Sequence, residues 1–282
     1  MKESEMLVQG FDHFVVPVND IVVAEDFYSQ VFGGKVVKRH GLTVRSRSLG
    51  PHTFIIIAEK RIGVYLQKEE RGTPITPKGT PTYSFTTTAQ GLQNVIRALE
   101  EWKINFDGPV KNTHSFAAST IFFADPAGNN FAVYVPTVEE NNGTTERLTG
   151  VGYLELEAPN LDASIKFYEQ VLGFKVLERG RDAQSNKTQA TMRMGSGQYL
   201  ILTETPFGPK GYPMSRLIPG PHLGFYVAPA RWKDALAQLD RLGIPNGDRG
   251  EEAKGRTPGG NQGTYMDDPA GYVIQYITEG MQ

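Results

Sequence analysis

The sequence predicts an α+β protein built from four βαβββ units, which pair to form cupped, half-barrel sheets. Two observations support this prediction. The chain contains an internal repeat, and each copy of the repeat alternates β-branched apolar runs with amphipathic helical segments. Because a single βαβββ unit has a sheet with one apolar face that must be covered, the units are expected to pair.

The repeat relates the two halves of the chain. Residues 10–36 and 150–176 share glycine and aromatic positions at a constant offset of 140 residues, and the Asp-Pro-Ala-Gly sequence at 125–128 returns at 268–271. The stretch between the copies is polar and acidic, which is typical of a linker. The predicted parts are an N-terminal domain at 8–137, a linker at 138–148 and a C-terminal domain at 149–280.

Each copy contains the strands and helices of two units. In the first copy, residues 13–18 predict a buried strand, and Asn19 or Asp20 is a candidate cap for the helix that follows. Further strands are expected at 43–49, 53–58 and 62–67. A strand near 83–87 then precedes a helix at 92–102, and strands at 117–124 and 131–135 complete the first copy. The second copy repeats this order, with helices expected at 161–172 and 230–242 and a last strand at 273–278.

Composition narrows the functional classes. The chain has 29 basic and 31 acidic residues, so its net charge of −2 argues against a nucleic-acid or anionic-membrane surface. No apolar run approaches the ~20 residues of a membrane helix. The absence of cysteine excludes disulfides, thiolate metal sites and cysteine nucleophiles. The polar start of the chain does not look like a signal peptide, so a cytoplasmic location is expected.

Three motifs suggest a family. They are a first strand that carries Asp12 and His13, a helix with a Phe-Tyr pair that occurs in both copies, and the two Asp-Pro-Ala-Gly turns, each followed by a strand. Together they resemble the vicinal-oxygen-chelate superfamily, which includes glyoxalase I, fosfomycin-resistance proteins, bleomycin-binding proteins and extradiol dioxygenases. The resemblance covers almost the whole chain and implies tandem vicinal-oxygen-chelate domains. Four units on one chain most resemble the two-domain extradiol dioxygenases.

The resemblance also implies a metal site in each domain. Family members hold a divalent metal, here Fe²⁺, Mn²⁺ or Zn²⁺, with side chains on the first strand, on the strand that opens the second half and after the terminal turn. In the first domain these positions are His13, Thr82 and Ala132, so this site is expected to be degenerate. His13 then has a second interpretation as a hydrogen-bonded core histidine.

In the second domain the implied ligands are Tyr153, His222 and Gln275. A divalent cation would be held there by a phenol, an imidazole and an amide, so a metal-free polar cluster that lines a pocket is an open alternative. There is also a third arrangement, because some members of the superfamily exchange half-barrels. If the first unit paired with the fourth, His13 would join His222 and Gln275.

Further candidates surround this set. Tyr265 lies ten residues before Gln275, an offset that resembles the substrate-binding tyrosine of extradiol dioxygenases. Those enzymes also carry an acid–base histidine at the position that Phe207 occupies here, which departs from the pattern. The candidate substrate-binding residues are Arg256, which would pair with an anionic group, and the aromatic residues Phe207 and Tyr212.

The resemblance, together with these residues, leaves three functions open. The first is an extradiol-dioxygenase-like oxidoreductase that acts on a small aromatic or enediol substrate in the C-terminal domain, with a role in aromatic compound catabolism. The second is a metal-independent lyase, isomerase or hydrolase that uses His222 with Tyr265 or Tyr153 as acid and base. The third is a small-molecule sequestering protein of the bleomycin-resistance type. The expected partners are a small molecule and further copies of the chain in a homodimer or larger assembly, without nucleic acid or membrane.

Overall fold

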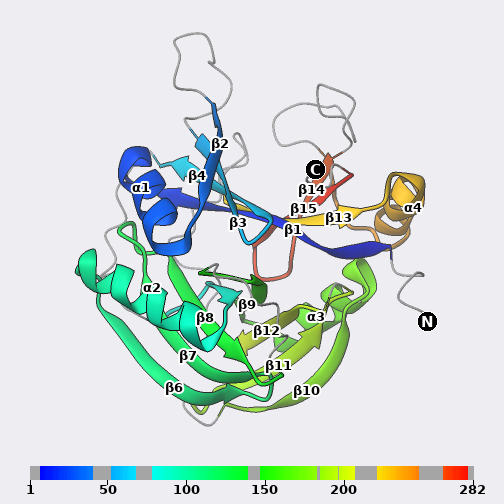
Figure 1. Ribbon diagram of the computed structural model, residues 1–282. Helices are drawn as coiled ribbons and strands as arrows, with labels where there is room; N and C mark the ends of the chain where they lie inside the picture. Colours follow the sequence, from blue (N-terminus) through cyan, green and yellow to red (C-terminus); the bar gives the residue numbers. More distant parts are fainter. Residues whose placement is uncertain are drawn as a thin grey trace. The chain divides into compact units, whose positions relative to one another are not determined.

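The computed structural model describes residues 7–40, 52–67, 78–138, 147–182, 185–195, 197–206, 221–247 and 263–278 (Figure 1). The first unit contains β1 (Val8–Val18), α1 (Ile21–Phe32), β2 (Lys35–His40), β3 (His52–Ile57) and β4 (Lys60–Leu66). The second contains β5 (Thr82–Thr86), α2 (Ala89–Glu101), β6 (Phe106–His114), β7 (Ala117–Ala124) and β8 (Asn130–Pro136).

The second half of the chain repeats this order. The third unit contains β9 (Gly150–Ala158), α3 (Leu161–Phe167) with a π-helical turn at Tyr168–Leu172, β10 (Lys175–Arg181), β11 (Thr188–Arg193) and β12 (Tyr199–Glu204). The described part of the fourth contains β13 (His222–Val227), a 3₁₀ turn at Pro229–Arg231, α4 (Trp232–Arg241), β14 (Gly263–Asp267) and β15 (Val273–Ile277). The α+β class and the tandem architecture are confirmed. None of the helices in these described ranges is both long and apolar enough to cross a bilayer.

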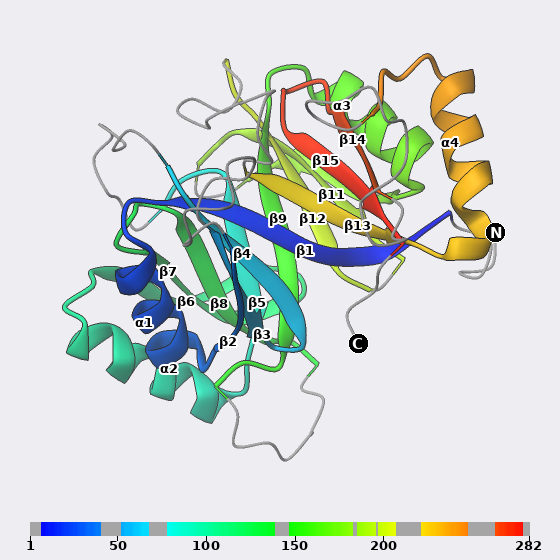
Figure 2. The same ribbon diagram turned by 90° about the horizontal axis from the view of Figure 1, so that it is seen from above.

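The strands form two sheets. The seven-stranded sheet has the order β14-β15-β13-β1-β4-β3-β2, and the eight-stranded sheet has the order β10-β11-β12-β9-β5-β8-β7-β6. In the first sheet, β1 pairs antiparallel with β13, and the two strands run side by side in Figure 2. The first unit therefore shares a sheet with the fourth, and the second shares one with the third.

This pairing corrects one expectation. The two units of one repeat copy do not share a sheet in the described strands, and the exchanged arrangement is present instead. The physical reason is that the opening strands of all four units offer the same kind of edge for hydrogen bonding. The sequence pattern within one unit therefore does not specify with which other opening strand its own opening strand pairs. The boundaries at 8–137, 138–148 and 149–280 describe the repeat and stay a prediction for independent domains.

The chain nevertheless forms two compact units that follow the repeat. One is Val16–Leu154, and the other comprises the residues before and after it. The boundaries fall within β1 and β9, so each of these strands begins in one compact unit and ends in the other. All members of the candidate site described below, from His13 to Gln275, belong to the unit that contains residues 155–282.

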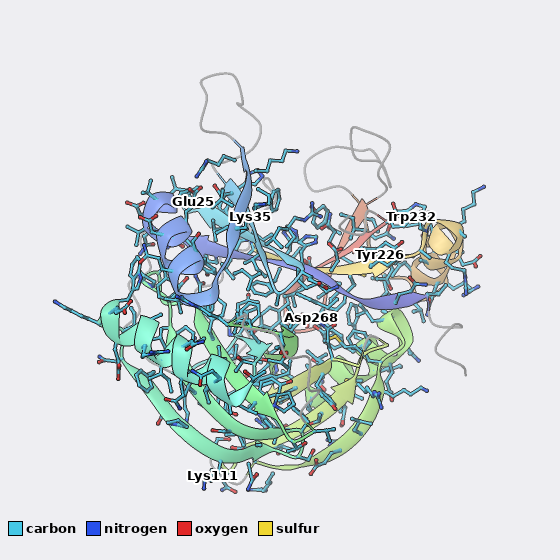
Figure 3. All side chains as sticks on the ribbon, viewed as in Figure 1. Glu25, Lys35, Lys111, Tyr226, Trp232 and Asp268 are labelled. Carbon is cyan, nitrogen blue, oxygen red and sulfur yellow. The ribbon has the colours of Figure 1, made fainter. Side chains whose placement is uncertain are left out.

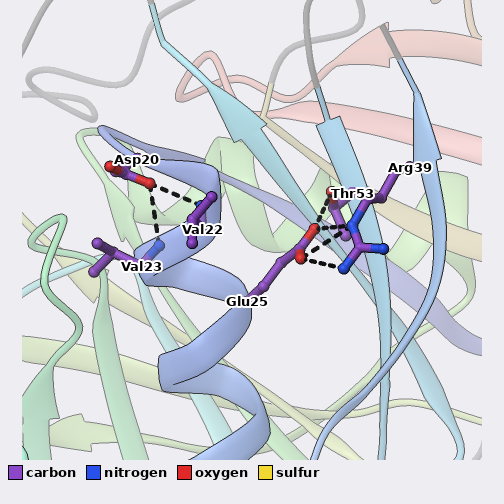
Figure 4. Close-up of polar contacts among 6 residues, drawn as sticks. All are labelled: Asp20, Val22, Val23, Glu25, Arg39 and Thr53. Atoms are coloured by element: carbon purple, nitrogen blue, oxygen red, sulfur yellow. Dashed lines mark hydrogen bonds and ion pairs between the residues drawn. The ribbon is translucent and has the colours of Figure 1, made fainter. Parts of the chain in front are cut away.

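Polar contacts fix the start of α1 and its side toward β2 and β3 (Figure 4). Asp20 caps the helix, since its carboxylate accepts hydrogen bonds from the backbone N–H groups of Val22 (2.8 Å) and Val23 (3.1 Å). Glu25, on the same helix, accepts a forked pair of hydrogen bonds from Arg39 of β2 and another from Thr53 of β3. The Arg39 guanidinium holds the pKa of Glu25 below its usual value.

A buried tyrosine–aspartate pair recurs in both compact units. The hydroxyl of Tyr28 donates to Asp125 at 2.9 Å, and that of Tyr168 donates to Asp268, labelled in Figure 3, also at 2.9 Å. Both aspartates begin an Asp-Pro-Ala-Gly turn and accept backbone N–H groups from it. Each pair therefore connects the helix of one βαβββ unit to the Asp-Pro-Ala-Gly turn of the next βαβββ unit along the chain.

Candidate functional site

Polar side chains form a row on one face of the seven-stranded sheet. His13 of β1 is paired with Gly224 of β13, Gly224 with Gln275 of β15, and Gln275 with Tyr265 of β14. Directly paired residues share a face of a sheet, and so do residues two apart on one strand. His13, His222, Gln275 and Tyr265 therefore all face the same side. We call these four residues the polar row.

The two histidines of the polar row are in contact. Their Nε2 atoms are 3.0 Å apart, and the planes of their rings are perpendicular, at 90°. This separation suits a hydrogen bond between the imidazoles. It equally suits two ligands of one metal ion, because two bonds of about 2.1 Å at a right angle place their nitrogens about 3 Å apart.

A buried carboxylate orients the first histidine. The Nδ1 atom of His13 lies 2.6 Å from Oδ2 of Asp12, and β1 has a register irregularity between Phe11 and His13 that lets these neighbouring side chains meet. Since the carboxylate accepts the Nδ1 proton, the lone pair of Nε2 is left for another partner. This carboxylate–histidine arrangement is the usual support of an imidazole that binds a metal.

A glycine makes room for the same ring. A methyl group at Gly224 would lie 2.3 Å from Cε1 and 2.4 Å from Nδ1 of His13, so the imidazole occupies the space over this glycine. A glycine within a strand often marks a close approach of another group. The sequence motifs do not predict the contacts that Asp12 and Gly224 make with His13, although a glycine inside the run that follows His222 is a usable signal.

The side chain of Gln275 contributes an oxygen atom that has no hydrogen-bond donor among the described residues. Its Oε1 is buried and receives no hydrogen bond from any residue that the structure describes. Buried polar atoms of this kind are rare and costly, and they often mark the place of an ion or a water. Next to it, the ring of Tyr265 meets that of His222 edge to face, with the ring centroids 5.4 Å apart.

These donors suit a divalent cation. Two imidazole nitrogens and an amide oxygen are a ligand set that Fe²⁺, Mn²⁺ and Zn²⁺ accept. In the described ranges no group of three His, Cys, Asp or Glu side chains is placed to hold a metal ion, so among these residues the third protein donor would be the amide of Gln275. The orphaned oxygen of Gln275 and the His13–His222 distance are the two observations that fit a metal here.

Tyr153 occupies a different sheet from its predicted partners. It lies in β9 of the eight-stranded sheet, where its ring packs against His114 (5.1 Å between centroids), Phe116 (5.9 Å) and Tyr134 (5.6 Å). The predicted set of Tyr153, His222 and Gln275 thus draws on two sheets. The other candidates, Arg256, Phe207 and Tyr212, lie outside the described residues.

The geometry and the repeat together define a class of protein. Residues 10–133 and 150–276 both match the family model of the Glyoxalase/Bleomycin resistance protein/Dioxygenase superfamily. The chain belongs to this superfamily, which confirms the resemblance seen in its motifs.

Curated relatives include plant enzymes. The chain is 28% identical over 174 residues to a lactoylglutathione lyase of Arabidopsis thaliana, a match that covers 60% of this chain and 56% of that protein. It is 27% identical over 177 residues to a putative lactoylglutathione lyase of Brassica oleracea var. gemmifera, with the same coverage. The chain therefore spans about half the length of the curated relatives it matches.

Solved structures show the same fold. A putative dioxygenase from Bacillus subtilis subsp. subtilis str. 168 superposes with a TM-score of 0.74 at 15% identity, over 98% of this chain and 87% of that one. Glyoxalase I from Zea mays superposes with a TM-score of 0.63 at 19% identity, over 95% and 92% of the two chains. At these identities the likeness concerns the fold alone.

Proposed function

We propose that the chain is a metal-dependent, dioxygenase-like enzyme in which His13, His222 and Gln275 hold a divalent cation. The observation that carries this proposal is the 3.0 Å separation of the two Nε2 atoms on the face that also holds the orphaned Gln275 oxygen. Three protein donors leave coordination positions open for a substrate. The proposed substrate is a small aromatic diol or enediol, which binds through two neighbouring oxygens.

The residues around the ligands have separate roles in this proposal. Asp12 holds the tautomer and orientation of His13, and Gly224 leaves room for its ring. Tyr265, half-buried beside His222, would hydrogen-bond an oxygen of the substrate. A bound divalent cation would supply a Lewis acid that favours the ionised form of a substrate hydroxyl.

The reaction we propose is oxidative ring opening. One carbon–carbon bond of an aromatic diol breaks, and both atoms of one O₂ enter the product, so the substrate supplies the electrons and no external reductant is required. A relative by fold carries the name of a putative dioxygenase, which agrees with this reaction class, whereas the relatives by sequence are named as lyases.

The contact between the histidines also favours a second function. At 3.0 Å, one imidazole can donate a hydrogen bond to the other, and Asp12 would stabilise a proton on His13. Such a pair can act as acid and base without a metal, with a contribution to rate of roughly 10²–10⁴. This second candidate is a lyase, isomerase or hydrolase on the same scaffold.

Metal content and turnover distinguish these functions. Protein stripped with a chelator is loaded with Fe²⁺ under anaerobic conditions, and O₂ uptake and the coloured ring-opened product are then followed with a panel of catechols and enediols. We expect one metal per chain in the wild type, its loss in His13→Ala and His222→Ala, and its retention in His52→Ala, which removes an imidazole of β3 outside the polar row.

Other outcomes would contradict the proposal. Turnover by metal-free protein that disappears in His222→Ala would support the acid–base enzyme instead. Tight binding of a panel compound that is released unchanged, with no O₂ uptake under any loading, would support a sequestering protein.

A further inference from the structure

The polar row provides no negative ligand. His13 donates its Nδ1 proton to Asp12 and is a neutral ligand through Nε2, and the amide of Gln275 is neutral at every pH. His222 would also bind as a neutral imidazole. The described ligands would therefore neutralise neither of the two positive charges of a divalent cation bound here.

This charge would be buried. The exposed fractions of His13, His222 and Gln275 are 3%, 6% and 4%, so water cannot solvate the cation from the side of the sheet. Isolated charges in such surroundings are strongly disfavoured unless an opposite charge is close. Asp12 offsets one charge from the far side of the His13 ring, which leaves about one positive charge for the ligand to neutralise.

From this balance we infer that Gln275 makes metal binding depend on the substrate: the cation and a singly charged anionic ligand with two adjacent oxygens bind cooperatively, each weakly without the other. This inference rests on the metal site of the proposed function and adds the charge of its ligand. Cooperativity of this kind is reciprocal, so the anion raises the affinity for the metal by the same factor as the metal raises the affinity for the anion.

A carboxylate at position 275 would make metal binding independent of the anionic ligand. Glutamate has nearly the same shape as glutamine, so Gln275→Glu adds one negative ligand charge without changing the volume of the side chain. The variant should bind the metal tightly on its own. Because the excess charge is already neutralised, the anionic ligand should then increase the metal affinity much less than in the wild type.

The test measures the affinity for Zn²⁺ with and without saturating tropolone, an aromatic compound whose monoanion binds metals through two adjacent oxygens. Isothermal titration calorimetry is used at pH 8, and the complex of Zn²⁺ with tropolone in free solution is measured separately and included in the fit. We expect tropolone to tighten Zn²⁺ binding at least about tenfold in the wild type, within the usual range of coupling between sites. Gln275→Glu should bind Zn²⁺ alone about tenfold more tightly and show a coupling below about threefold.

Two results would overturn the inference. One is equal Zn²⁺ affinity of the wild type and Gln275→Glu without tropolone, and the other is the same coupling factor in both proteins. If the wild type binds Zn²⁺ tightly alone and His222→Ala abolishes the binding, the metal site stands and only the charge argument fails. If no protein binds Zn²⁺ with or without tropolone, the proposed function itself fails.

Folding of Gln275→Glu is checked by circular dichroism and thermal melting. If this variant does not fold, Gln275→Ala replaces it. That change removes a donor but adds no charge, so Zn²⁺ affinity should fall while the tropolone coupling stays at least about tenfold. A coupling that disappears in Gln275→Ala would contradict the inference.

Discussion

The two sheets share one architecture but differ in the residues at equivalent positions. Both join two opening strands, β1 with β13 in one sheet and β9 with β5 in the other. The repeat aligns the positions in pairs, and the pairs are His13 with Tyr153, His222 with Thr82, Gly224 with Ser84, and Gln275 with Ala132. The seven-stranded sheet therefore carries potential metal ligands at positions where the eight-stranded sheet carries Tyr, Thr, Ser and Ala.

In the eight-stranded sheet, the positions that correspond to the polar row are filled by aromatic packing. Tyr153 is fully buried against Tyr134, Phe116 and His114, and the hydroxyl of Ser84 bonds both the N–H and the carbonyl of Tyr153. In contrast, the Tyr–Asp pairs that tie helices to terminal turns are kept in both halves. Residues that determine the fold are thus repeated, whereas residues that would perform chemistry occur on one sheet.

Among the variants that test this difference between the two sheets, Gly224→Ala should have the largest effect on metal binding and turnover. The new methyl group would lie 2.3 Å from the His13 ring, so the imidazole must move and the metal should be lost, with turnover reduced at least about 100-fold. Metal analysis and steady-state kinetics measure both effects. The control is Gly180→Ala in β10, where an added methyl group meets nothing within 4 Å. Full metal content in Gly224→Ala would contradict the described position of His13.

Removing one hydroxyl from each sheet tests which tyrosine takes part in the reaction. Tyr265→Phe should lower kcat about 10- to 100-fold, because it removes the hydrogen bond to the substrate but no metal ligand. Tyr153→Phe should leave metal content and kcat within about twofold of the wild type, as its ring packing is retained. If Tyr153→Phe loses the metal, the chemistry involves the eight-stranded sheet and the comparison fails.

Asp12→Asn tests the support of His13. The amide keeps the shape of the side chain but no longer accepts the Nδ1 proton as an anion, so the metal affinity should fall about 10- to 100-fold. Calorimetric titration with Zn²⁺ measures this change, and the thermal stability of the metal-free protein serves as the control for folding. An unchanged affinity would mean that Asp12 has only a structural role.

Much of the fold could be predicted from the sequence. Most of the errors concern contacts between residues that are far apart in the sequence. Apolar periodicity located the helix at 230–242, found at Trp232–Arg241, and the last strand at 273–278, found at Val273–Ile277. The helix expected at 161–172 ends as α-helix at Phe167 and continues as a π-helical turn to Leu172. Local patterns carry this information because helix and strand periods are local properties.

The candidate site was predictable only in part. His222, Gln275 and Tyr265 were recognised from their spacing to motifs within one unit, and the structure places them on one face. Tyr153 was assigned to them on the assumption that units of one copy share a sheet. The structure instead places His13 beside His222 because the opening strands of distant units are paired, and no local pattern encodes that choice.

The last prediction concerns the repeated Tyr–Asp pairs, which should affect stability and not metal binding or turnover. Burial raises the pKa of Asp268 from 3.8 to about 6, so the folded protein binds a proton more tightly than the unfolded chain. Stability from this group is therefore complete below pH ~4 and is lost as pH rises through ~6, by up to about 3 kcal/mol. Asp268→Asn should flatten this part of the pH profile of the unfolding free energy, measured by urea denaturation.

The matched residue and an exposed control complete this experiment. Burial also raises the pKa of Asp125, so Asp125→Asn should change the profile in the same direction. Asp240→Asn, at an exposed position of α4, should leave the profile unchanged. A wild-type stability that rises between pH 4 and 7, and does so equally in Asp268→Asn, would contradict the argument from burial.

In the proposed site, His13 of the first unit and His222 of the fourth unit bind one metal ion. X-ray absorption spectroscopy of the Zn²⁺-loaded protein tests it directly, because imidazole ligands give a countable scattering signal. We expect two imidazoles per zinc in the wild type and no more than one in His13→Ala. A single imidazole in the wild type, with a spectrum that His13→Ala leaves unchanged, would contradict it.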